Sequence, residues 1–257
     1  MDQFHPDDPR HDPEAQRRLD RGRLIRAVNA SLAFVLLLVL VYSAQGNFNV
    51  ARYAVEPQAI AGLLGILTAP LLHGSVEHIV ANSVALLMLG TLAGSVYPRA
   101  TLWSLPLIWI SSGLVAWILG DAGTRHLGAS GLSHGLMFLI FTLGLLRRDR
   151  QAIATGMVVF LFYGGMLLTV LPHEPGVSWQ SHLGGAFGGV LGAFLFRRLD
   201  PLLPRKRYSW EDEEEAISAL EDELEPPAPR DVPVLWQRRE DEASRGVVLR
   251  FPPRERD

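Results

Sequence analysis

The stretch HLGASGLSHGLMFLIFTLGLL, residues 126–146, contains no Asp, Glu, Lys or Arg. A second uncharged stretch, PGVSWQSHLGGAFGGVLGAFLF, covers residues 175–196. Each is long enough to cross a bilayer as a helix, which takes ~20 mostly apolar residues. The first stretch holds Ser130 and the second holds His182. Because polar groups are expensive in hydrocarbon and usually serve a function there, these two residues are the first functional candidates.

Further windows between Arg26 and Arg197 are also free of charged side chains. A bilayer offers no water to satisfy backbone polar groups, so windows of this length are expected to be helices. We therefore predict an all-α, polytopic membrane protein, built as a bundle of six transmembrane helices. The six windows are Ala27–Ala51, Ile79–Pro98, Ala100–Gly120, His126–Leu146, Gln151–His173 and Pro175–Phe196.

The segment Pro57–Val76 is also uncharged and could be mistaken for a seventh span. It contains two prolines and three glycines, and it leaves only Glu77 and His78 to turn the chain before the next window. Counting it as a span would also move the basic residues of 147–150 to the outer side. We expect a loop embedded in the outer membrane interface, where irregular backbone is tolerated if protein buries it.

The basic residues predict the orientation, because Lys and Arg next to spans favour the cytoplasmic side. Six spans with the N-terminus inside place fourteen basic residues of the helix flanks inside and only Arg52 and Arg125 outside. Both termini are then cytoplasmic. The same arrangement brings a set of polar residues to the outer ends of their spans: His73, His78, Asn82, Ser130 and His182.

Ser130 and His182 could form a nucleophile and its base, since imidazole can take the serine proton as attack begins. Such a pair needs contact at ~2.6–3.2 Å, and small residues would let the two helices approach that closely. Most small-residue stripes serve packing alone. Here they coincide with the candidate pair: Gly131 and Gly135 on one helix, Gly184, Gly188 and Gly192 as one stripe on the other, and Gly185 and Gly189 as a second stripe on the face of His182.

His78 and Asn82 are four residues apart, so they point from one face of a helix. Both can donate hydrogen bonds, and donors aimed at a developing oxyanion are often the largest contribution to catalysis. The six predicted spans contain no Asp or Glu. A Ser-His dyad therefore fits better than a Ser-His-Asp triad.

Other interpretations of these residues remain open. A histidine near a helix end is often an interfacial residue, and a serine in a span often bonds its own backbone. A metal site of His73, His78 and His182 is conceivable, although no HExxH motif occurs. His134, one turn after Ser130, could be a packing residue, a gating group or a rival base, and packing is favoured.

The composition divides the chain into three parts. Residues 1–25 are expected to be a disordered cytosolic arm, 26–200 the six-helix core, and 201–257 an acidic, proline-containing cytosolic tail that includes a possible short helix to Glu223. The chain has no cysteine, which excludes disulfides and thiolate metal sites. We expect no cofactor, no metal and no nucleic-acid partner. No further targeting segment is recognised, so a bacterial plasma membrane is the expected location.

Three elements of the chain resemble those of a known family, the rhomboid intramembrane serine proteases. HGSVEHIVAN at residues 73–82, GASG at 128–131 and HLGGAFGG at 182–189 resemble the family's HxxxxHxxxN, GxSG and HxxGxxxG patterns. They occur in the family's order on the second, fourth and sixth predicted spans. The resemblance covers roughly residues 26–200.

The resemblance implies that Ser130 is the nucleophile and His182 the general base. It also implies that His78 and Asn82, with the Ser130 backbone N–H, form the oxyanion hole. The walls of the site and its supporting contacts would involve His73, His134, Gly128, Gly131, Gly185 and Gly189. The segment Pro57–Val76 would belong to the family's first loop, embedded sideways in the outer leaflet.

The expected function is therefore an intramembrane serine endopeptidase that cleaves transmembrane segments of membrane proteins near their outer ends, with the active site toward the outer face. The alternative is a non-catalytic membrane scaffold or chaperone of the same fold that binds single-span proteins. A small transporter is a weaker alternative, because no inverted repeat is evident. Two features depart from the family: His134 stands where many members have an aromatic residue, and the first loop lacks their Trp-Arg pair.

Overall fold

The computed structural model describes residues 13–172, 176–200 and 217–218. The chain separates into two units, Met1–Pro204 and Arg205–Asp257. Of the second unit only the helical residues Ile217 and Ser218 are described, so the predicted acidic tail lies almost wholly outside the described residues. Within the described residues the fold is all-α, as predicted, and the only strand-like pairing is an isolated bridge between Val55 and His126.

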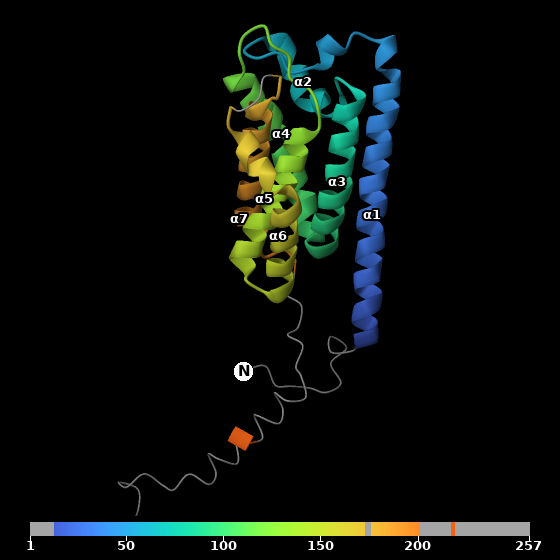
Figure 1. Ribbon diagram of the computed structural model, residues 1–257, viewed down its shortest axis with the longest axis vertical. Helices are drawn as coiled ribbons and strands as arrows, with labels where there is room; N and C mark the ends of the chain where they lie inside the picture. Colours follow the sequence, from blue (N-terminus) through green and yellow to red (C-terminus); the bar gives the residue numbers. More distant parts are fainter. Residues whose placement is uncertain (1–12, 173–175, 201–216, 219–257) are drawn as a thin grey trace, which may run out of the picture. The chain divides into compact units, whose positions relative to one another are not determined.

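The first unit is a bundle of long helices that run side by side, with shorter helices gathered at one end (Figure 1). The long helices follow the predicted windows closely. They are α1 (Pro13–Ala44), α3 (Val76–Val96), α4 (Pro98–Leu119), α5 (Ser130–Arg147), α6 (Arg150–Tyr163), which continues as the 3-10 helix η6 (Gly164–Val170), and α7 (Trp179–Phe196).

Five helical segments of the described chain are long and apolar enough to cross a membrane: Gln16–Asn47, Val76–Val96, Pro98–Leu119, Ser130–Arg147 and Arg150–Val170. The outward faces of these segments carry large apolar side chains, of which Leu40, Leu161 and Phe162 are 68%, 78% and 68% exposed. A bilayer accounts for such exposure, because lipid tails are as apolar as these side chains. The chain is therefore an integral membrane protein. α7 is not among the five, since its first turns hold Gln180, Ser181 and His182 and its apolar residues alternate with glycines.

α5 lies at the centre of the bundle and α1 at its edge. In α5, 61% of the apolar window is buried, against 11% in α1. α7 packs against both α4 and α5, α6 packs against α5, and α1 packs mainly against α3. The helix that holds Ser130 is thus enclosed by its neighbours, and the helix that holds His182 lies directly against it.

The first helix begins at Pro13, so the prediction of a disordered arm over residues 1–25 is wrong for 13–25. Proline is well tolerated at the first helical position. Glu14 and Arg18 form an ion pair one turn apart, and Gln16 donates a hydrogen bond to Asp20. Each such contact adds a few tenths of a kcal/mol, about 0.2–0.5. They extend a helix that the following apolar segment already stabilises.

The segment between α1 and α3 contains no spanning helix. It consists of short helices: η2 (Gln45–Asn47), η3 (Val50–Tyr53), η4 (Ile60–Gly62), α2 (Leu63–Thr68) and η5 (Ala69–Leu71). At 6 residues, α2 is far too short to cross a bilayer. The interpretation of Pro57–Val76 as a loop rather than a seventh span is therefore confirmed.

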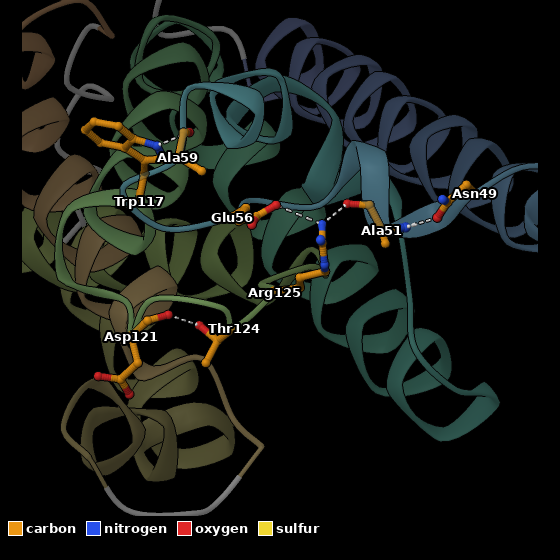
Figure 2. A network of polar contacts seen from close by, with 8 residues as sticks. All are labelled: Asn49, Ala51, Glu56, Ala59, Trp117, Asp121, Thr124 and Arg125. Carbon is orange, nitrogen blue, oxygen red and sulfur yellow. Dashed lines mark hydrogen bonds and ion pairs between the residues drawn. The ribbon is translucent and has the colours of Figure 1, made fainter.

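This first loop is joined to the α4–α5 connection by several polar contacts (Figure 2). Arg125 forms an ion pair with Glu56 at 3.1 Å and donates a hydrogen bond to the carbonyl of Ala51. The indole N–H of Trp117, in the last turn of α4, also donates to the carbonyl of Ala59 at 2.9 Å. The two segments thus form one layer over the end of the bundle where α3, α5 and α7 begin.

Candidate active site

Ser130 is the first residue of α5, and the turn before it depends on a glycine. Gly128 has a φ of +117°, a region that L side chains rarely adopt, and a Cβ there would collide with the ring of His78. The Gly128 N–H donates to the carbonyl of Ala69 at 2.9 Å, which fixes this turn to the first loop. At the start of a helix the Ser130 N–H has no acceptor within its own helix and remains available for a ligand.

The glycine stripes of α7 allow its close approach to two neighbours. A Cβ on Gly185 would overlap the carbonyl of Gly131, and one on Gly189 would overlap that of Gly135. The other stripe faces α4, where a Cβ on Gly184 would overlap the carbonyl of Ser111. Backbones can come this close only where no side chain separates them. The stripe of Gly185 and Gly189 therefore lies against α5, as expected, whereas the stripe of Gly184, Gly188 and Gly192 lies against α4, a contact that the sequence did not predict.

This packing brings Ser130 and His182 together. The Oγ of Ser130 lies 2.9 Å from Nε2 of His182, within the range required for proton transfer. His182 is 6% exposed. On the other side of its ring, Nδ1 lies 2.9 Å from the backbone carbonyl of Thr169. A carbonyl only accepts, so Nδ1 carries the proton and Nε2 presents its lone pair to the serine hydroxyl.

Thr169, in η6, thus occupies the position that an aspartate holds in a Ser-His-Asp triad. A backbone carbonyl orients the imidazole and fixes its tautomer without adding a full negative charge to the membrane interior. The residue does not stand out in the sequence, because the interaction uses its backbone. The predicted spans contain no Asp or Glu, which is consistent with a backbone carbonyl rather than a carboxylate as the partner of His182.

His134 stacks on His182, with ring centroids 3.8 Å apart and an interplanar angle of 12°. Its Nδ1 lies 2.7 Å from the carbonyl of Ser130, to which it donates, and its Nε2 lies 2.8 Å from Oγ1 of Thr169. His134 does not contact Oγ of Ser130 through either nitrogen. These contacts favour the packing role over that of a rival base.

His78 and Asn82 line the same cavity as Ser130 and His182, and residues of the α4–α5 connection and of the start of α7 complete its lining. The cavity has a volume of about 1200 Å³. Asn82 is 5% exposed, and one of its amide N–H groups donates to the carbonyl of His78 at 2.8 Å. Its second amide N–H, which an amide always has, remains to serve a ligand. The structure thus brings all four predicted residues to one cavity.

His73 lies behind His78 and away from the cavity. His73 is 1% exposed, its ring has no hydrogen-bond partner among the described residues, and it meets the ring of His78 edge-on at 5.1 Å. Its backbone N–H and C=O both bond the side-chain amide of Gln45. Burial, with a smaller effect from His78, lowers the pKa of His73 to about 4. His73 is therefore a neutral packing support for His78.

A metal site has no support among the described residues. Within 13–172, 176–200 and 217–218, no three His, Asp, Glu or Cys side chains are close enough together to hold an ion. The alternative of a site built from His73, His78 and His182 is not formed there.

Sequence reasoning missed two further residues at this end of the bundle, His126 and Ser178. The Nδ1 of His126 lies 2.6 Å from Oγ of Ser178, which is the N-cap of α7. Both residues lie in the connections rather than in the apolar helices. The available signal was that each stands four residues before a member of the Ser130–His182 pair.

Comparison with known proteins identifies the family of the chain. The family model named Rhomboid domain matches residues 61–199. Uncharacterized proteins of Mycobacterium bovis and Mycobacterium tuberculosis are 37% identical to the chain over 185 residues, which is 68% of this chain and 77% of the relative. An uncharacterized protein of Mycobacterium leprae is 33% identical over 189 residues, 68% of this chain and 75% of the relative. The all-α bundle, the small-residue packing and the extent of the match lead to one conclusion: this chain belongs to the rhomboid family.

Proposed function

We propose that the protein is an intramembrane serine endopeptidase, with Ser130 as nucleophile and His182 as general base. The observation that carries the proposal is the 2.9 Å contact between Ser130 Oγ and His182 Nε2 beside a cavity large enough for a peptide segment. Membership of the rhomboid family supports the same chemistry, because the family generally consists of serine proteases.

The reaction begins when the Ser130 oxygen attacks the scissile carbonyl carbon as His182 Nε2 takes the hydroxyl proton. The Nδ1 proton, held by the Thr169 carbonyl, stays in place, so the imidazolium keeps its orientation. The tetrahedral intermediate collapses, the C–N bond breaks, and Nε2 gives its proton to the departing amine. Water then attacks the acyl-enzyme, with His182 again as base, and Ser130 is released.

The oxyanion of each tetrahedral intermediate needs donors that are already in place. In the proposal these are the Ser130 backbone N–H, the second amide N–H of Asn82 and the ring of His78. Their support is positional: Ser130 begins a helix, and His78 and Asn82 line the same cavity.

Six transmembrane spans complete the proposal. α7 becomes the sixth because it packs against α4 and α5 along its length, although its own composition is less apolar than that of the other five. Both termini then lie in the cytoplasm, and the end of the bundle with α2 and the cavity faces outward. The helical segment Ile60–Leu71 then lies in the outer interface.

The substrates in this proposal are transmembrane proteins cut near the outer ends of their spans. A helical substrate must unwind locally, because its own hydrogen bonds shield the peptide carbonyls. The relatives in mycobacteria support a bacterial plasma membrane as the location.

The alternative is a non-catalytic scaffold of the same fold that binds single-span proteins. A scaffold has no need for an aligned hydroxyl and imidazole, and the fixed tautomer of His182 favours the enzyme. Reconstituted wild type and Ser130→Ala should be incubated with a panel of single-span proteins that carry helix-breaking residues near the outer end. Cleavage by wild type alone supports the enzyme, whereas binding by both variants without cleavage by either supports the scaffold.

A further inference from the structure

His126, in the α4–α5 connection, makes a polar contact with each nitrogen of its ring. Its Nδ1 lies 2.6 Å from Oγ of Ser178, and its Nε2 lies 3.0 Å from Oγ1 of Thr124. The Thr124 hydroxyl donates its single proton to the carbonyl of Asp121 at 2.6 Å, so it can only accept from His126. The neutral ring with its proton on Nε2 accepts at Nδ1, and the Ser178 hydroxyl is shared between this nitrogen and the Oγ of Ser181.

Burial favours this neutral form. His126 is 9% exposed, and its pKa is lowered by desolvation, with a smaller opposing effect from Asp121. The ring therefore offers little surface to a substrate. It connects two segments of the protein instead.

The partner of His126 is the residue that begins α7. Ser178 caps the helix by accepting from the N–H of Ser181, and its Oγ lies 2.8 Å from that of Ser181. The Ser181 carbonyl in turn accepts from the hydroxyl of Ser112 on α4 at 3.0 Å. The first turn of α7 is thus held from two sides, by the α4–α5 connection and by α4.

The spacing relates this contact to the catalytic pair. Ser130 follows His126 by four residues, and His182 follows Ser178 by four residues. Two contacts therefore join the same two segments, four residues apart on each of them. They are His126–Ser178 at 2.6 Å and Ser130–His182 at 2.9 Å. Because N-cap and fourth helical residue lie on one face of α7, a shift at Ser178 moves His182 in the same direction.

The α4–α5 connection is itself well anchored, which lets His126 act as a fixed point. The backbone of His126 exchanges two hydrogen bonds with Val55 of the first loop, both 2.9 Å long. The neighbouring Arg125 bonds Glu56 and Ala51 of the same loop (Figure 2).

We propose that His126 and Ser178 form a clasp that positions the dyad, by fixing the start of α7 against the segment that leads into Ser130. This role rests on the proposed function, since it concerns the rate of attack by Ser130. His126 is a positioning residue in this account, and it takes no part in the proton transfers.

The test measures acylation of Ser130 by a fluorophosphonate in the purified full-length protein, well below the unfolding temperature. His126→Phe keeps an aromatic ring at this position but loses both polar contacts. We expect this variant to be acylated about tenfold more slowly, because small misplacements of reacting groups are costly. Ser178→Ala should behave likewise. Ser178→Thr keeps the hydroxyl and the N-cap, so it should stay within about twofold of wild type.

The matched control is Ser43→Ala, which removes an exposed hydroxyl that bonds only the Val39 carbonyl of its own helix, and this variant should be acylated at the wild-type rate. With a cleavable transmembrane substrate, the variants that lack the clasp should lower kcat and keep KM. The double variant His126→Phe/Ser178→Ala should lose less than the product of the two single effects, since both substitutions remove the same His126–Ser178 bond.

The clasp would be overturned if His126→Phe were acylated at the wild-type rate, or if Ser178→Thr were acylated as slowly as Ser178→Ala. If His126→Phe does not fold, the Ser178 pair alone decides. Failure of the proposed function has a different signature, because wild type itself would then not be acylated at Ser130.

Discussion

His182 and Thr169 are joined by a hydrogen bond of 2.9 Å between the imidazole Nδ1 and the backbone carbonyl. This contact determines which ring nitrogen carries the proton and turns the unprotonated Nε2 toward Ser130. The same threonine reaches the stacked His134 with its hydroxyl, at 2.8 Å. One residue of η6 thus fixes two adjacent imidazoles, by its backbone in one case and by its side chain in the other.

The Thr169 side chain can be tested apart from its backbone. Thr169→Val removes the hydroxyl at nearly constant volume, and with it the 2.8 Å contact to Nε2 of the buried His134, at a cost of about 1–3 kcal/mol. We expect lower stability and a several-fold lower kcat, since the stacked ring shifts against His182. Thr169→Ser retains the hydroxyl and should restore most of the rate. Equal rates for the two variants would contradict the account.

Asn82→Ala tests the oxyanion hole. Loss of one donor of this kind typically lowers kcat by about 10²–10³-fold. Because the proposed interaction forms only in the transition state, KM should change little. The measurement is steady-state cleavage of a transmembrane substrate, with thermal unfolding as the control for stability. An unchanged kcat would remove Asn82 from the site.

Gly185→Ala tests the contact between α5 and α7. Its Cβ would overlap the carbonyl of Gly131, so the helices must separate, which costs about 1–3 kcal/mol by analogy with overpacked cores. We expect a lower unfolding temperature and loss of cleavage, since Ser130 and His182 are moved apart. Gly46→Ala is the control, because its Cβ would meet no atom within 4 Å. Equal effects of the two substitutions would contradict the packing argument.

His73 predicts how stability depends on pH. Its pKa is lowered from 6.5 to about 4, mainly by burial, so between these values the unfolded chain binds more protons than the folded one. The free energy of unfolding is therefore highest above pH 6.5 and decreases as the pH falls toward 4, because protons then bind preferentially to the unfolded chain. At about 1.4 kcal/mol for each pKa unit, His73 contributes up to about 3 kcal/mol of this dependence.

The measurement is the free energy of unfolding in detergent at pH 7.5 and pH 5 for wild type and His73→Phe. The variant cannot be protonated at this position, so it should lose less stability on acidification than wild type. An identical loss in both proteins would show that His73 titrates alike in the folded and unfolded states.

The sequence was sufficient for the parts of the fold that depend on apolar length and small residues. Uncharged windows correspond to the long helices, and the glycines of α7 predict its approach to α5, because both follow from local pattern. The sequence positions of His73 and His78 also predict that both residues lie near one end of the bundle. These features need no knowledge of distant contacts.

Other features depend on contacts that no local pattern encodes. The window Gln151–His173 reads as one span, but the α-helix ends at Tyr163 and η6 continues it with tighter turns. That change brings the Thr169 carbonyl to His182. The His126–Ser178 bond joins residues 52 positions apart, which the sequence places near the starts of two predicted spans without relating one to the other. The start of α1 at Pro13 does not follow from the sequence, because a charged, polar composition is common to disordered segments and to solvated helices.

The central claim is that His182 activates Ser130, and an intact-mass measurement after fluorophosphonate treatment tests it most directly. Wild type, Ser130→Ala and His182→Ala should be treated in parallel, and the modified residue mapped by proteolysis. The account predicts one adduct on Ser130 in wild type, none in Ser130→Ala, and a strongly slowed adduct in His182→Ala. Equal labelling of all three proteins, or none of wild type, would contradict it.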